Sequence, residues 1–128
     1  MRIKLTSIMV DDQSKALAFY TTVFGFVKKQ EIPLGEFRWL TVVSPDGRDD
    51  LELLLEPNAN PAGKAFQTAM FGQGIPVASF EVSDIGQECK RLKGHGVAFT
   101  QEPTRMGPVT IALCADTCGN LVQLYQPA

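Results

Sequence analysis

The chain contains two copies of one sequence pattern, and this repeat limits its fold more than any other feature. Ser7–Asp12 matches Ser79–Asp84, with serine, valine and aspartate at the same places. With an offset shorter by one residue, Phe24-Gly25-Phe26 matches His95-Gly96-Val97, and Leu51-Glu52-Leu53 matches Val122-Gln123-Leu124. Two similar units within 128 residues predict one pseudo-symmetric domain, with a ligand site where the copies face each other.

Composition excludes several classes of function. The net charge is −2 and no basic stripe is present, so nucleic acid is not an expected partner. No apolar run approaches the length that spans a membrane, so no membrane association is expected. The three cysteines are odd in number and lack the spacing of a zinc site, which fits a reduced, cytoplasmic protein.

Each copy has the pattern of a βαβββ unit. Strands alternate apolar and polar residues, and the helix after the first strand of each copy begins at an aspartate that can accept hydrogen bonds from free backbone amides. In the first copy Asp12 is this cap and Gly25 ends the helix. We expect its strands at 4–10, 26–32, 37–44 and 51–56, and its helix at 14–24.

The second copy repeats this order after a linker. Asp84 is the helix cap, and an apolar stripe of Ile85, Cys89 and Leu92 predicts the buried side of the helix. The only histidine, His95, is expected in a surface loop at the helix end. We expect strands at 77–82, 98–101, 109–115 and 121–125, and a short linker helix at 62–71.

Motifs in both halves of the chain form a recognisable set. They are Val10-Asp11-Asp12 through Ala16–Tyr20, Val23–Phe26, Val82-Ser83-Asp84, Leu92, Gly96-Val97 and Cys118–Tyr125. With these motifs the chain resembles, over almost its whole length, the vicinal-oxygen-chelate superfamily, which includes glyoxalase I, bleomycin-resistance proteins and extradiol dioxygenases. The resemblance implies an α+β fold in which two tandem βαβββ units form facing, curved, mixed sheets around a cleft. The domain would then comprise a first unit at 1–57, a linker at 58–76 and a second unit at 77–128.

The resemblance also implies where a metal would be held. Metal-using members supply His, Gln or Glu from four inward positions on the first and last strand of each unit. The corresponding residues here are Leu5, Glu52, Val77 and Gln123. Leucine and valine cannot ligate, and a zinc or iron site needs three or more protein ligands. We therefore expect no metal cofactor, with Glu52 and Gln123 as the fallback ligands of a divalent ion.

Strand alternation predicts which side chains line the cleft. Glu52 is the first candidate, because a carboxylate among leucines is unfavourable without a purpose; we expect burial to raise its pKa, and expect a general base or a hydrogen-bond anchor. Trp39 is expected to stack on a flat ligand, and Arg38 to pair with a ligand anion. On the third and seventh strands, Phe37, Trp39, Thr41, Thr110 and Ala112 are expected to point inward. The remaining candidate ligand contacts are Gln123, Ser79, Glu56, Tyr125 and Met106.

Several functions fit these residues. The first is a metal-free protein that binds a small organic molecule in the cleft between the units. The alternative is a metal-dependent lyase, isomerase or dioxygenase that uses Glu52 and Gln123. Metal-free acid–base catalysis by Glu52, and a module without a ligand, also stay open, and the sequence leaves undecided whether any turnover occurs. A homodimer is expected in each case, because the sheet edges need covering.

Overall fold

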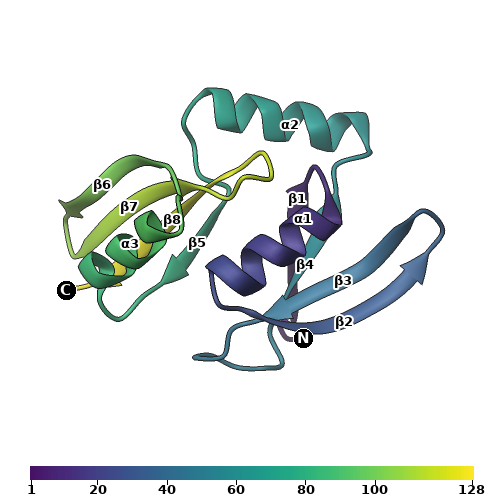
Figure 1. Ribbon diagram of the computed structural model, residues 1–128, viewed down its shortest axis with the longest axis horizontal. Coiled ribbons are helices and arrows are strands. Elements are labelled where there is room, and N and C mark those ends of the chain that lie inside the picture. The colour runs from purple at the N-terminus through teal and green to yellow at the C-terminus, as the bar shows by residue number, and fades with distance from the viewer. The chain divides into compact units, whose positions relative to one another are not determined.

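The computed structural model describes residues 1–128 and contains two four-stranded mixed sheets with three α-helices (Figure 1). The strand orders are β1-β4-β3-β2 and β5-β8-β7-β6, so both sheets have the same topology. In each sheet the first strand pairs parallel with the last, and the other pairs are antiparallel. The α+β class and the two tandem βαβββ units predicted from the sequence are thus confirmed.

The first unit closely follows the predicted elements. Asp12 caps the first helix, because its Oδ1 accepts a hydrogen bond from the backbone N–H of Lys15 at 2.9 Å. Gly25 follows this helical segment with a φ of 83°, a conformation that favours glycine. The last part of the helix is a π-helical turn, which the sequence did not indicate. The elements are β1 (Leu5–Val10), α1 (Gln13–Ala18), the π-helix (Phe19–Val23), β2 (Val27–Leu34), β3 (Phe37–Val43) and β4 (Glu52–Pro57).

One face of the first sheet packs against α1 and the π-helix. Tyr20 is fully buried and its ring lies edge-on to Phe19 and Phe24, at centroid distances of 5.5 and 5.3 Å. Alternate strand residues meet this layer, which is why the opposite face is free to carry other side chains. The buried residues on the helix side are Ile8, Val10, Leu40, Val42, Leu53 and Leu55.

The second unit contains β5 (Ala78–Glu81), α3 (Ile85–Gly94), β6 (Phe99–Met106), β7 (Val109–Ala115) and β8 (Leu121–Pro127). Asp84 caps α3 by accepting from the Gln87 N–H at 3.0 Å, and the predicted stripe of Ile85, Cys89 and Leu92 is buried. His95 is exposed at the helix end, as expected. All three cysteines are free and buried, and burial raises the pKa of the Cys114 thiol to about 12.

Two predictions for the second unit are wrong. Strand β6 extends to Met106 rather than ending at Gln101, because the chain accommodates Pro103 at a register shift between Gln101 and Thr104. Thr110 and Ala112 were expected to point inward, away from α3, but they lie on the side of the sheet that α3 covers. Ala112 is fully buried and pairs with Leu124 on the face that α3 covers, so Ile111 and Leu113 take the other face.

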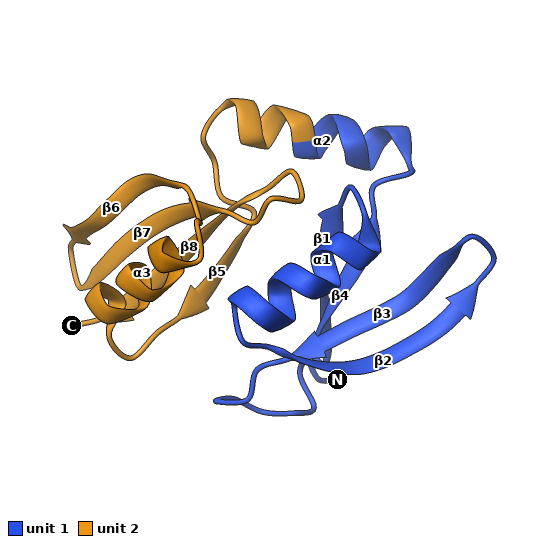
Figure 2. Ribbon diagram, in the orientation of Figure 1, with its two compact units in different colours: residues 1–67 blue, residues 68–128 orange.

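The chain divides into two compact units, residues 1–67 and 68–128 (Figure 2). The boundary lies within α2 (Pro61–Gly72), the expected linker helix. Its first half is fixed to the first unit, because Gln67 Nε2 donates to the Met9 carbonyl at 3.0 Å and Asn58 Nδ2 donates to Gln67 Oε1 at 2.8 Å. None of the helices combines the length and apolar character that a membrane crossing requires.

Candidate functional site

Glu52 lies at the start of β4 and belongs to a small hydrogen-bonded cluster. Its Oε1 accepts hydrogen bonds from Thr41 Oγ1 at 2.7 Å and from Gln30 Nε2 at 2.5 Å. The backbone N–H of Gln30 donates in turn to Thr41 Oγ1 at 3.2 Å. Three neighbouring strands, β2, β3 and β4, therefore hold this carboxylate in one position.

The cluster lies on the face of the first sheet opposite α1, which we call the distal face. Register places Leu5 level with Glu52, and Ile32 level with Trp39. Most side chains of this face are apolar, and several are substantially exposed, with Leu5 at 41% and Ile32 at 48%. Strand pairing and alternation assign to this face Leu5, Ser7, Met9, Val27, Gln30, Ile32, Leu34, Phe37, Trp39, Thr41, Val43, Glu52, Leu54 and Glu56.

Arg38 does not join this site. Its guanidinium lies on the helix side, where NH1 pairs with Glu31 at 2.6 Å and NH2 donates to Ser14 Oγ at 2.7 Å. Side chains alternate along β3, so Arg38 points away from the face that carries Trp39 and Glu52. The expected pairing of Arg38 with a ligand anion on that face is therefore not supported by its position.

The second unit has its own distal face, opposite α3. Gln123 Nε2 donates to Ser79 Oγ at 2.9 Å, and these two residues are level in the β5–β8 pair. Tyr125 lies two residues further along the same face, level with Ile111. Met106 pairs with Val109 at the end of the hairpin and is 53% exposed. Four predicted contact residues thus share one face of the second unit.

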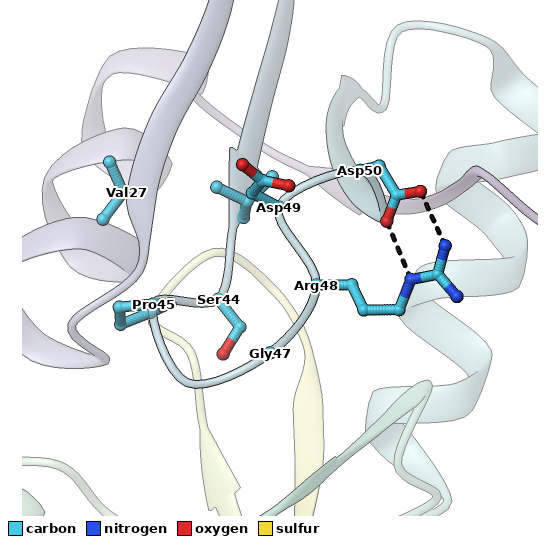
Figure 3. Close-up of a pocket in the computed structure, with 8 residues that line it drawn as sticks. Val27, Ser44, Pro45, Gly47, Arg48, Asp49 and Asp50 are labelled. Carbon is cyan, nitrogen blue, oxygen red and sulfur yellow. Dashed lines mark hydrogen bonds and ion pairs between the residues drawn. The ribbon is translucent and has the colours of Figure 1, made fainter.

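A hollow of about 670 Å³ lies at the β3–β4 connection of the first unit (Figure 3). Its wall is mostly the polar loop 44–50, in which Arg48 and Asp50 form an ion pair at 2.7 Å. Val43 lines the hollow and also belongs to the distal face. Because Val42 is level with Leu53, Val43 follows β3 toward the end of β4 at which Glu52 lies. The hollow therefore borders the Glu52 end of the distal face, although Glu52 does not line it.

The ionisation of Glu52 differs from the sequence-based expectation. Hydrogen bonds from Thr41 and Gln30 lower the pKa of Glu52 below its usual value, and desolvation opposes this only in part. Lys29 and Lys4 lower it further by their charge. The prediction of a raised pKa was wrong, because it counted the apolar neighbours and not the donors. At neutral pH Glu52 is an ionised acceptor and a poor general base.

This ionisation predicts a pH-dependent contribution to stability. The pKa of Glu52 is lower in the folded chain than in the unfolded chain, so its stabilising effect is complete above about pH 4.5 and is lost as the pH falls through the folded value. We expect Glu52→Gln to lower the free energy of unfolding by about 1 kcal/mol at pH 7. Urea unfolding of both proteins from pH 3 to pH 8 measures the difference, and a difference that grew on acidification would contradict the assignment.

Gln30 is the site residue that sequence reasoning missed. Strict alternation from Val27 would point Gln30 toward the helix, but a register shift between Lys28 and Gln30 turns it to the distal face. The same shift recurs between Phe99 and Gln101 in the second unit, at the repeat offset of Gln30 and Gln101. A glutamine repeated at this offset was the available signal, and the bulge that gives it meaning was not visible in the sequence.

The residues at the family's metal positions do not fit a metal site. Leu5 lies level with Glu52 and offers only hydrocarbon, and Gln123 lies level with Ser79 rather than with Val77. No group of three or more His, Cys, Asp or Glu side chains is arranged to hold an ion. The donors near Glu52 are a hydroxyl and an amide already bonded to it, which is too weak a set for zinc or iron.

Comparison with known proteins agrees with this geometry. A family model described as Glyoxalase/Bleomycin resistance protein/Dioxygenase superfamily matches residues 2–124. The protein YurT of Bacillus subtilis (strain 168) is 56% identical over 126 residues, which cover 98% of this chain and 99% of YurT. The crystal structure of UcmS2 has a TM-score of 0.84 and 32% identity, and covers 98% of this chain and 97% of its own.

A further solved structure is TnmS3, an antibiotic binding protein from Streptomyces sp. CB03234. It has a TM-score of 0.79 and 27% identity, and the match covers 100% of this chain and 97% of TnmS3. Family model, relatives and fold therefore agree over nearly the full length. The chain belongs to the glyoxalase/bleomycin resistance protein/dioxygenase superfamily.

Proposed function

We propose that this protein binds a small organic molecule with a flat apolar part on the distal face of the first unit, and that it does so without a metal. The observation that carries the proposal is an ionised Glu52, fixed by Thr41 and Gln30, on a face of exposed apolar side chains. An apolar surface with a few fixed polar groups is the usual composition of a small-molecule site. Trp39, on the same face, offers a large aromatic surface.

The similarity to TnmS3 supports the same conclusion. That protein is described as antibiotic binding, and its likeness to this chain extends over the whole length of the chain. The residues argued above supply what such binding needs, which is apolar area and one oriented acceptor. Gln123, Ser79, Tyr125 and Met106 share the corresponding face of the second unit, and we propose them as ligand contacts of that face. A ligand cleft between the two units and a homodimer stay predictions.

The alternative is a metal-dependent lyase, isomerase or dioxygenase that uses Glu52 and Gln123. The superfamily name includes such enzymes, but Leu5 beside Glu52 leaves one oxygen ligand where a cluster is needed. Native mass spectrometry of freshly purified protein separates the two functions. A retained organic molecule supports the binding function, whereas a stoichiometric divalent ion supports the enzyme. The same spectrum gives the number of subunits.

Trp39 is the only tryptophan, so its indole N–H gives a single reporter signal in a ¹H–¹⁵N NMR spectrum. We expect 2-naphthol, a flat aromatic with one hydroxyl, to shift this signal in a saturable way. Trp39→Leu should weaken 2-naphthol binding about five-fold by calorimetry, which corresponds to about 1 kcal/mol of lost aromatic contact.

Phe99→Leu is the matched control for this test. Phe99 is also a partly exposed aromatic residue of a strand, but it pairs with Cys114 on the face that α3 covers. We expect its replacement to leave the affinity unchanged. Equal losses in the two variants, or a Trp39 signal that does not move at saturating 2-naphthol, would contradict binding on the distal face.

A further inference from the structure

We infer that the ligand carries a protonated amine and binds through it to Glu52 Oε2, so that the site selects flat apolar cations and rejects carboxylates. This inference rests on the proposed function and names the chemical class of the ligand. The geometry that carries it is the unequal use of the two oxygens of one carboxylate. Both hydrogen bonds from the protein go to Oε1.

Glu52 Oε2 accepts no hydrogen bond from the protein. A carboxylate has lone pairs for about four donors, and Oε1 already takes the two from Thr41 and Gln30. These two residues act as positioning residues, because they fix the plane of the carboxylate and leave one oxygen for an external donor. A charged donor forms the strongest hydrogen bond with such an oxygen.

The nearby lysines do not neutralise Glu52 directly. Lys4 Nζ pairs with Asp50 at 2.9 Å, and Lys29 Nζ donates to the carbonyl of Asp49. Both ammonium groups are therefore held at the β3–β4 connection instead of on the carboxylate of Glu52. The direct ion pair that Glu52 lacks within the protein is available to a ligand.

The charged side chains that strand register assigns to the distal face of the first unit are Glu52 and Glu56, and both are acidic. Lys29 lies in the bulge of β2, and its charge reaches Glu52, but its ammonium group is held on the Asp49 carbonyl. Arg38, the arginine of β3, faces the helix side of the sheet and is paired with Glu31. At Glu52 Oε2, a carboxylate ligand would meet like charge at hydrogen-bond distance, whereas an ammonium group would meet a favourable charge.

The test uses three probes with the same ring: 2-naphthylmethylamine, 2-naphthol and 2-naphthoate. Each is titrated into the wild-type protein at pH 7, with the Trp39 indole signal as the readout. We expect the amine to bind at least ten-fold more tightly than the carboxylate, with the hydroxyl compound between them. The comparison needs no variant, so it holds even if a substitution at Glu52 impairs folding.

Glu52→Gln then assigns the selectivity to one residue. This change keeps the side-chain shape and removes the charge, so we expect the amine-to-carboxylate ratio to fall to within about three-fold. Glu56→Gln is the matched control and should keep most of the ratio, because no donor orients Glu56 in the way that Thr41 and Gln30 orient Glu52.

The outcomes separate this inference from the proposed function. If all three probes shift the Trp39 signal with equal affinity, the distal face binds flat molecules and the amine selectivity is wrong. If the ratio survives in Glu52→Gln, the selectivity comes from other residues and the inference is also wrong. If no probe shifts the signal, the proposed function fails, and the inference fails with it.

Discussion

Replacing Gln13 with leucine is expected to lower the free energy of unfolding by about 3 kcal/mol. Gln13 is a polar residue of α1, yet the residue is only 7% exposed. Its Nε2 donates to the carbonyls of Arg38 and Leu55 at 2.7 and 2.9 Å, and its Oε1 accepts from the Arg38 N–H at 3.0 Å. Leucine fills a similar volume but leaves three backbone groups without these partners.

The reason for this arrangement is a gap in the first sheet. Strands β3 and β4 are paired only at Thr41–Leu54 and Val42–Leu53, whereas β7 and β8 of the second unit are paired along seven positions. Gln13 bonds the two backbones beyond the end of the short ladder, where β3 and β4 no longer bond each other. The repeat places Ile85 at the corresponding position of the second unit, where the continuous ladder needs no such bridge.

Urea unfolding at pH 7 measures the effect, with Gln87→Leu as the matched control. Gln87 is an exposed glutamine of α3, so the same chemical change should alter stability by less than about 0.5 kcal/mol. Because Arg38 is adjacent to Trp39, Gln13→Leu should also weaken 2-naphthol binding under conditions in which the variant is folded. Equal stability of the two variants would show that the Gln13 bridge is replaceable by water.

The elements that local chemistry determines could be predicted from the sequence. Asp12 and Asp84 each precede an apolar helical stripe, where a short acceptor side chain can bond the free N–H groups of the first helical turn. Both predicted caps are present. The repeat gave the order of strands, since each copy had to make the same sheet. The position of Glu52 on one face with Thr41 followed from alternation along β3 and β4.

The features that were missed depend on contacts between strands. One extra residue in β2 turns Gln30 toward Glu52, and alternation within a single strand cannot reveal a bulge. The face of β7 that carries Thr110 and Ala112 was predicted by alternation to point inward, but this face packs on the side that α3 covers. The ionisation of Glu52 was missed for the same reason, because its donors come from two other strands.

Replacing Asp116 with alanine is expected to have the largest effect, a loss of about 4 kcal/mol in the free energy of unfolding. Asp116 begins the β7–β8 turn and is fully buried. Its Oδ1 accepts from the N–H groups of Cys118 and Asn120 at 2.8 and 3.0 Å, and its Oδ2 accepts from Asn120 Nδ2 at 2.8 Å. Alanine would remove the acceptors of these three buried N–H hydrogen bonds, and the melting temperature should fall by more than about 10 °C.

Two further variants define the cause. Asp116→Asn keeps an acceptor for the backbone amides but places one amide nitrogen against another at Asn120, so we expect about half of the loss. Asp46→Ala is the matched control, because Asp46 occupies the corresponding turn of the first unit, is exposed, and has a side chain that accepts no hydrogen bond. Its replacement should change stability by less than about 0.5 kcal/mol. A similar small change for Asp116→Ala would mean that water reaches this turn and satisfies the donors, and that the two turns are fixed by the backbone alone.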